Sequence, residues 1–232
     1  LLAGEKFIID MLYYAKKSSN SKNHIKKGKC PIISLYLVRN IDNAEPYFKK
    51  LKQRLNELDK CLNMNADIIF WHDPNTPLFH NKKSSRQQWQ WIASNFSGIF
   101  GYNLYSSNLK TYRAKPKETF AKFYLNAKDM NQIKWKKHAK SVGVKYIHSV
   151  QPGYNDRNLR GSNRPAIESS VDFFLKDWER IIKRMGQDEH VIITSFNEWY
   201  EGTAIEPDTK NKSKLLEANK NVVESINNYI CK

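Results

Sequence analysis

Short apolar segments rich in β-branched and aromatic residues recur along the chain, and each is followed by a stretch with helical periodicity. The segments are apolar throughout rather than alternating, so as strands they need cover on both faces. Parallel sheets in α/β proteins are built in this way. The pattern predicts an α/β fold of five βα units, with strands at Ile32–Val38, Asp67–Trp71, Gly98–Tyr102, Val144–Val150 and Val191–Phe196.

Apolar residues at helical spacing predict the helices that cover this sheet. Before the second helix, Asp42 or Asn43 is a suitable N-cap residue. In the third helix, Leu175 and Ile182 belong to the apolar stripe together with Trp178. The helical patterns span residues 7–15, 47–62, 171–185 and 215–230.

Polar loops follow the predicted strands, whereas the segments that enter the strands are mostly lysine and glycine. Both barrels and open doubly wound sheets bind ligands at the carboxyl ends of their strands. We therefore expect the functional site on the loops at residues 71–74, 102–103, 151–156 and 197–202.

The chain of 232 residues carries 39 Lys and Arg against 23 Asp and Glu, which gives a net charge of +16. Such an excess favours contact with anionic surfaces. The lysines are spread along the chain rather than gathered beside aromatic residues, so no specific nucleic-acid-binding module is indicated. No apolar run approaches the roughly 18 residues that cross a bilayer, which argues against a membrane span.

The cysteines, Cys30, Cys61 and Cys231, are odd in number and widely spaced. This usage indicates neither a disulfide framework nor a zinc cluster, and it does not fix a cellular compartment. A weak candidate for a metal site follows the second predicted strand, where intervening prolines prevent a regular ligand geometry. Its residues are His72, Asp73 and His80. We expect no metal and no cofactor.

The densest set of reactive side chains follows the last predicted strand, in Ser195–Pro207. Glu198 and Glu201 are neighbouring carboxyl groups, and such pairs divide the roles of acid and base in the cleavage of glycosidic bonds. Trp199 offers an apolar face to a sugar ring, and Asn197 can bond a sugar hydroxyl. The alternative is structural: Glu198 caps the following helix, while Glu201 and Glu206 pair with nearby lysines.

The same segment carries a family resemblance. Phe196–Pro207, with the sequence FNEWYEGTAIEP, resembles the Asn-Glu-Trp-x-Glu-Gly-Thr-x-Ile-Glu signature of glycoside hydrolase family 99. Ser149–Asp156 followed by Arg160 is similar to the loop after the seventh barrel strand of that family, and Gly98–Tyr102 is similar to its sixth strand. The resemblance extends from about Pro31 onward.

This resemblance implies a (β/α)8 TIM-type barrel and a retaining, endo-acting hydrolase of α-mannosidic linkages in a glycan or polysaccharide, without a metal in the chemical step. It implies that Glu198 assists the sugar 2-hydroxyl in attacking the anomeric carbon, and that Glu201 is the general acid and base. The implied substrate-binding residues are Asn197, Tyr154, Arg160, Tyr102, Trp199 and Asp156.

The sequence also departs from the family pattern. Tyr200 stands where endomannosidases carry His, and Ala204 stands where they often carry Gln. Glu206–Asp208 is closer to related glycosyltransferase-like domains that occur with surface-polysaccharide biosynthesis genes. A polysaccharide-biosynthesis transferase and a non-catalytic carbohydrate-binding domain are therefore alternatives.

Five βα units are three fewer than the eight of a closed barrel. We therefore expect residues 1–232 to be a single portion of a catalytic domain, corresponding to strands 4 to 8 of the barrel. The helix at Leu1–Ala15 then precedes the fourth strand, and the strand at Ile32–Val38 has an edge without a neighbouring strand. The competing arrangement is a self-sufficient open sheet.

Overall fold

The computed structural model describes residues 3–36, 44–67, 85–102, 117–160, 166–186, 189–209 and 213–230. Helices alternate with strands along these residues, which confirms the predicted α/β class. The chain divides into two compact units, and each is described by itself. The first contains the described residues up to 67 and those within 85–100 and 138–146, and the second contains those within 101–137 and from 147 onward.

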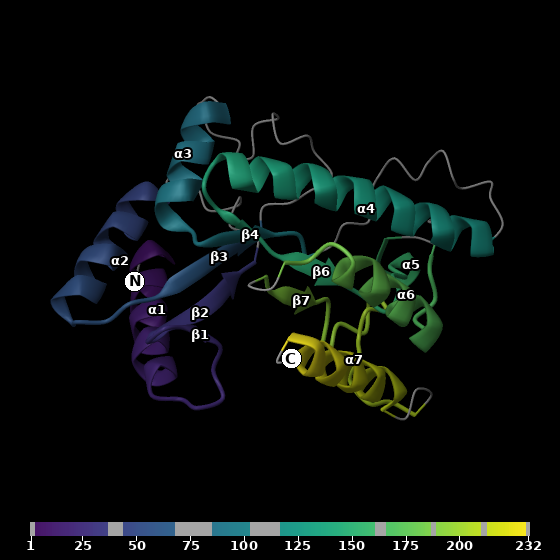
Figure 1. Cartoon of the computed structure of the whole chain (residues 1–232). Coiled ribbons are helices and arrows are strands. Elements are labelled where there is room, and N and C mark those ends of the chain that lie inside the picture. Colours follow the sequence, from purple (N-terminus) through teal and green to yellow (C-terminus); the bar gives the residue numbers. More distant parts are fainter. Residues whose placement is uncertain are drawn as a thin grey trace. The chain divides into compact units, whose positions relative to one another are not determined.

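The first unit is built on a five-stranded sheet in the order β1-β2-β3-β4-β5. Figure 1 labels its first four strands. Neighbouring strands from β2 to β5 are parallel, whereas β1 is antiparallel to β2. The strands are β1 (Lys26–Lys27), β2 (Cys30–Leu35), β3 (Asn63–Asp67), β4 (Gly98–Phe100) and β5 (Lys145–Tyr146).

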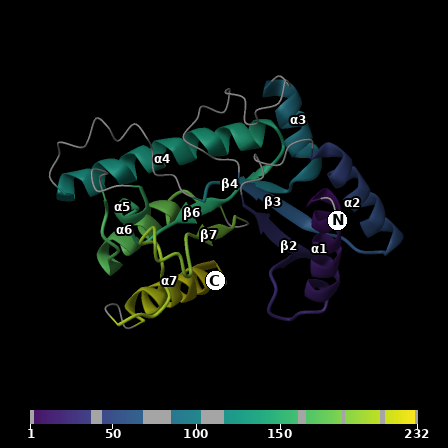
Figure 2. The same cartoon turned by 180° about the vertical axis from the view of Figure 1, so that it is seen from behind.

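Aromatic packing joins the helices of the first unit, which are α1 (Ala3–Ser19), α2 (Glu45–Glu57) and α3 (Ser85–Asn95). α1 and α2 lie side by side in both views (Figures 1 and 2), and the rings of Phe7 and Phe48 are 5.3 Å apart. The ring of Phe48 is also 5.4 Å from that of Trp91 on α3 and 5.2 Å from that of Phe96. These contacts place Phe48 at the centre of the apolar core.

β1 covers the start of β2 on the side away from β3. Lys27 pairs with Cys30 in this short antiparallel ladder. The amide of Ile32 donates to Ile25 O at 2.9 Å, and His24 Nε2 lies 2.9 Å from Ile32 O. The preceding chain therefore turns back onto Cys30–Ile32, at the start of the strand whose edge was expected to lack a neighbour.

A disulfide joins Cys30 to Cys61, with their Cα atoms 5.1 Å apart. The strand register explains the bond, because Ile32 pairs with Asn63 and each cysteine lies two residues before this pair. Neighbouring strands are about 4.8 Å apart, which suits the Cα separation of a disulfide. Cysteine usage indicated no disulfide framework and did not predict this single bond, since spacing along the chain does not reveal which strands are adjacent.

The second unit holds two parallel strands, β6 (His148–Val150) and β7 (Val191–Ile193), in which His148 pairs with Val191. Its helices are the larger part of α4 (Lys117–Ser141), the short α5 (Arg157–Arg160), α6 (Val171–Ile182) and α7 (Lys214–Ile230).

α6 and α7 pack beside β6 and β7 (Figure 2). α6 follows Ser170, whose hydroxyl accepts the amide of Phe173 at 3.2 Å, as expected of an N-cap serine. The apolar core between these elements consists of Val150, Phe174, Trp178, Ile181, Ile205, Leu215 and Ala218.

Some element boundaries differ from those predicted. The strand expected at Val144–Val150 is divided into β5 and β6, with Ile147 between them. α2 begins at Glu45 with Ala44 at its N-cap position and no side-chain cap bond, so the predicted cap is wrong. β3 (Asn63–Asp67) lies earlier than the strand predicted at Asp67–Trp71 and shares only Asp67 with it. Residues 68–71 of that prediction, and residues 37–38 of the first predicted strand, lie outside the described residues.

Candidate functional site

The loop that follows β7 leaves the core after Thr194 and returns to it at Thr203, and both of these residues are fully buried. The amide of Ser195 donates to Thr203 O at 3.0 Å, and the amide of Ile205 donates to Ser195 O at 3.1 Å. The hydroxyl oxygens of Ser195 and Thr203 lie 3.0 Å apart. These contacts close the base of the loop and fix where residues 196–202 emerge.

The tip of this loop presents aromatic rings: Phe196 is 54% exposed, Trp199 46% and Tyr200 70%. A turn closes at Gly202, whose amide donates to Trp199 O at 3.1 Å and whose φ of +63° favours glycine. Trp199 Nε1 donates to Glu206 Oε2 at 3.1 Å, which holds the indole in one orientation. The loop therefore offers ordered aromatic surface.

Both predicted catalytic carboxylates, Glu198 and Glu201, lie on this loop, and both are half-buried. The amide of Glu198 donates to Ser195 Oγ at 2.9 Å, and Glu198 Oε1 accepts the amide of Tyr200 at 3.2 Å. Backbone and side chain of Glu198 are thus both oriented by the loop itself. Residues 199–209 form turns and loop rather than helix, so the alternative of a helix cap does not apply.

The loop after β6 packs closely against residues 167–170. A Cβ built on Gly153 lies 2.7 Å from Ile167 O and from Ser169 N, so only glycine fits there. Tyr154 and Ile167 exchange two backbone hydrogen bonds of 2.8 Å, and the amide of Ser170 donates to Pro152 O at 3.1 Å. The position of this loop is therefore set by backbone contacts on one side.

Tyr154 and Asp156, two of the predicted substrate-binding residues, are buried, with 2% and 0% of their surfaces exposed. The Tyr154 hydroxyl donates to Asp156 Oδ2 at 3.2 Å, and the ring belongs to a core cluster with Tyr124 and Phe173. Their positions suit an orienting role inside the loop rather than a surface that a ligand touches.

A backbone hydrogen bond joins the two loops, because the amide of Asn155 donates to Glu201 O at 2.7 Å. Gly202 also lies against Asn155, since a Cβ at Gly202 would be 3.3 Å from Asn155 Cβ. The structure thus brings Glu201 beside the loop that carries Tyr154 and Asp156.

The remaining predicted residues are less closely connected. Tyr102 is half-buried, and its carbonyl accepts the hydroxyl of Thr194 at 2.7 Å, which places its backbone beside the end of β7. Asn197 is exposed on the loop with the two carboxylates. Arg160 is the last residue of α5, and its side chain lies outside the described residues. The weak metal candidate, His72, Asp73 and His80, also lies outside them.

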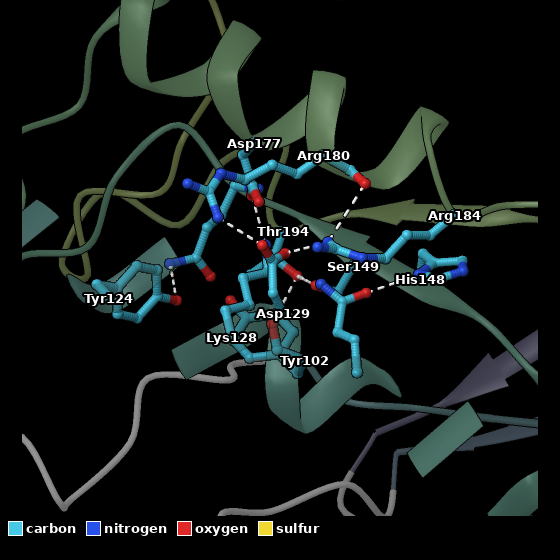
Figure 3. A network of polar contacts seen from close by, with 12 residues as sticks. Tyr102, Tyr124, Lys128, Asp129, His148, Ser149, Asp177, Arg180, Arg184 and Thr194 are labelled. Carbon is cyan, nitrogen blue, oxygen red and sulfur yellow. Dashed lines mark hydrogen bonds and ion pairs between the residues drawn. The ribbon is translucent and has the colours of Figure 1, made fainter. Parts of the chain in front are cut away.

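Sequence inspection missed a buried polar network in the second unit (Figure 3). Lys128 on α4 and Asp177 on α6 form an ion pair in which both side chains are buried. Asp177 Oδ2 also accepts the amide of Gln151 at 3.0 Å, directly after β6, and Gln151 Nε2 donates to the Tyr124 hydroxyl at 2.6 Å. Asp177 lies on the buried face of α6, and a charged residue in such a face indicates that it needs a partner, although it does not identify Lys128 as that partner.

Burial governs ionisation in and beside this network. It lowers the pKa of the Lys128 ammonium and raises the pKa of the Asp177 carboxyl, while the attraction between the two groups acts in the opposite sense. The pKa of His148 is lowered to about 4, chiefly by burial, although Glu189 nearby favours the charged form. His148 is therefore neutral at pH 7.

Two grooves of the second unit are lined by helices. One of about 760 Å³ is lined mainly by α4 and α6, the other of about 610 Å³ by α6 and α7, and neither is lined by a predicted site residue. Among the described residues, no His, Cys, Asp and Glu side chains cluster in a way that would hold a metal ion. In the same part of the chain, no helix is long and apolar enough to cross a membrane.

The family model of glycosyl hydrolase family 99 matches residues 107–220, a range that includes both loops. The family 99 endo-α-mannosidase from Bacteroides thetaiotaomicron has a similar fold, with a TM-score of 0.64, 17% identity, and coverage of 97% of this chain and 63% of its own. That enzyme in complex with bis-tris propane gives a TM-score of 0.58 at 19% identity, with coverage of 95% and 66%. A glycoside hydrolase-like protein gives 0.64 at 16% identity, with coverage of 93% and 61%.

These likenesses concern the fold, because the identities are low. The chain spans between 61% and 66% of the length of the three structures. An α/β fold that corresponds to part of a TIM-type barrel accounts for this partial coverage. The family match over residues 107–220 and the shared fold together make the chain similar to glycoside hydrolase family 99.

Proposed function

We propose that this protein is a retaining glycoside hydrolase that cleaves α-mannosidic linkages within a glycan or polysaccharide. One observation carries the proposal: Glu198 and Glu201 lie on a single ordered loop after β7, inside the segment that matches family 99. The similar fold of an endo-α-mannosidase supports the choice of linkage.

Glu198 is the proposed base in the first step. Its carboxylate takes the proton of the sugar 2-hydroxyl, and O2 then attacks the anomeric carbon while the glycosidic bond breaks, which forms a 1,2-anhydro sugar. The bond from the Tyr200 amide to Glu198 Oε1, at 3.2 Å, supports this role because it orients the carboxylate. The other oxygen of the carboxylate is then the one directed at the substrate.

Glu201 is the proposed general acid and base. It gives its proton to the departing glycosidic oxygen, then takes a proton from the water that opens the anhydro sugar at the anomeric carbon, while Glu198 returns its proton to O2. The anchor from the Asn155 amide to Glu201 O, at 2.7 Å, supports a fixed position for this residue. Positioned acid–base groups need such support.

Substrate contacts are proposed for the exposed part of the same loop. Trp199 is 46% exposed and its indole is oriented by Glu206, as an aromatic platform for a sugar face requires. Asn197 is exposed beside it. Further contacts are proposed for Arg160 and Tyr102, with Tyr154 and Asp156 acting from inside the neighbouring loop.

The test is incubation of the protein with α-mannan oligosaccharides, with and without a nucleotide sugar, followed by mass spectrometry of the products. We expect shorter chains without a donor, and loss of these products in Glu201→Gln. Glu217→Gln, which changes an exposed glutamate of α7, is the matched control. Lengthening that depends on the donor would instead support the transferase, and binding without turnover would support a carbohydrate-binding domain.

A further inference from the structure

Asp177 connects the interior of the second unit to the end of β6. Its side chain is 1% exposed, and its Oδ2 atom accepts two donors, the ammonium of Lys128 and the backbone amide of Gln151 at 3.0 Å. Gln151 is the first residue after β6 and is itself fully buried. A charged acceptor thus meets the backbone where the strand becomes the loop.

A gain in folding stability does not by itself explain the buried ion pair of Lys128 and Asp177. Apolar residues of similar volume often replace a buried ion pair without loss of stability, because the desolvation of two charges offsets their attraction. What apolar residues do not supply is an acceptor for the Gln151 amide, and hydrogen bonds to a charged acceptor are stronger than those between neutral groups. Lys128 makes a buried carboxylate tolerable at this point, and the carboxylate holds the amide.

The held amide stands at the beginning of the loop that reaches Glu201. From Gln151 the chain passes through Pro152 and Gly153, which are packed against residues 167–170. It then reaches Asn155, whose amide donates to Glu201 O at 2.7 Å. A shift of Gln151 therefore moves one end of a short segment whose other end anchors Glu201.

We infer that Asp177, supported by Lys128, is a positioning residue for Glu201 and acts through the Gln151 amide and the loop after β6. Its effect on sugar cleavage rests on the function proposed above. Its effect on the loop does not depend on that function and is measurable by itself.

Two double variants separate positioning from the ion pair. Lys128→Met/Asp177→Asn removes both charges but keeps an amide oxygen that accepts from Gln151. Lys128→Met/Asp177→Leu removes the same charges and leaves the Gln151 amide without this acceptor. Asn and Leu both branch at Cγ and have the same number of side-chain heavy atoms, so the main difference between the two variants is the polar group that accepts from Gln151.

Hydrogen exchange of the Gln151 amide is the direct measurement, and turnover of α-mannan oligosaccharides is the functional one. We expect exchange at least about 10-fold faster in the leucine variant than in the asparagine variant. We also expect kcat to be lower in the leucine variant than in the asparagine variant by up to about 10-fold, because small displacements of a catalytic group are costly. KM is expected to be nearly unchanged. Equal exchange and equal kcat in the two variants would overturn the inference.

Failure of the proposed function gives a different result. If the unmodified chain cleaves no oligosaccharide, the proposed hydrolase activity fails, and the exchange comparison alone decides whether Asp177 positions the loop. If the leucine variant does not fold, Gln151→Pro is compared with Gln151→Ala. Both lose the bond to Tyr124, but only the proline lacks the amide, so equal exchange of the Asn155 amide and equal kcat in this pair would contradict the inference.

Discussion

Removing the Cys30–Cys61 disulfide is expected to destabilise the first unit by about 4 kcal/mol. The bonded cysteines are 31 residues apart in sequence. In the chain-entropy description, a crosslink across a loop of this length removes about 12 cal/mol/K of entropy from the unfolded chain, which is about 4 kcal/mol at 25 °C. The unfolded state gains this freedom when the bond is broken.

The assay is urea unfolding of the Cys30→Ser/Cys61→Ser variant, followed by hydrogen exchange of peptides from β2, α2 and β3. With a slope of about 2 kcal/mol/M, the midpoint of this unit falls by about 2 M urea. Cys231→Ser is the matched control, because it removes a cysteine and leaves the bond in place. Reducing agent shifts the midpoint of that control as well.

Thiol titration shows whether the bond exists at all. The sequence has 3 cysteines and the bond uses two of them, so unfolded protein without reductant exposes one thiol, and reduced protein exposes three. Three thiols before reduction would refute the disulfide. An unchanged urea midpoint in the double serine variant would refute the entropic reasoning while leaving the bond itself in place.

Three further outcomes test the site and the core. Glu201→Gln is expected to lower kcat by about 10²- to 10⁴-fold while calorimetry shows unchanged oligosaccharide affinity, and unchanged turnover would reassign the acid. Glu206→Ala removes the bond that orients the Trp199 indole, so it is expected to weaken oligosaccharide binding when Trp199 is present. The same substitution should have no further effect in Trp199→Phe, and additive losses of binding would exclude this coupling. The pKa of His148 is lowered to about 4 in the folded protein, so between about pH 6.5 and 4 the unfolded state binds more protons than the folded state. The free energy of unfolding therefore falls by about 3 kcal/mol as the pH drops through this window. Urea unfolding at pH 7, 5 and 4 measures that loss, which should be absent in His148→Gln.

Apolar periodicity predicted the positions of α6 and α7 but not the whole buried face of α6. Leu175 and Ile182, which the stripe included, are 40% and 41% exposed, whereas Asp177 is buried. A stripe defined by hydrophobicity excludes a charged residue, and the burial of Asp177 depends on a partner in another helix. That partner, Lys128, lies 49 residues away in sequence, so the local pattern contains no sign of it.

The proximity of the loops after β6 and β7 followed from the sequence, because polar loops at the carboxyl ends of neighbouring parallel strands converge. The internal geometry of the candidate site did not. The bond between Asn155 and Glu201 uses backbone atoms only, so no residue type in the sequence predicts it. The disulfide was missed for a related reason, since it depends on the register that places Ile32 opposite Asn63.

The backbone bond between the two loops also determines where sequence variation is tolerated. Side-chain replacement at Asn155 or Tyr200 leaves the amide of residue 155 and the carbonyl of Glu201 in place, so a library that varies these two side chains keeps the atoms of this backbone bond. Gly153 and Gly202 stay fixed in such a library, because a side chain at either meets backbone or an unfavourable φ. Transfer of the β7 loop to another scaffold keeps this bond only if the β6 loop is transferred with it, because the amide belongs to Asn155 and the carbonyl to Glu201.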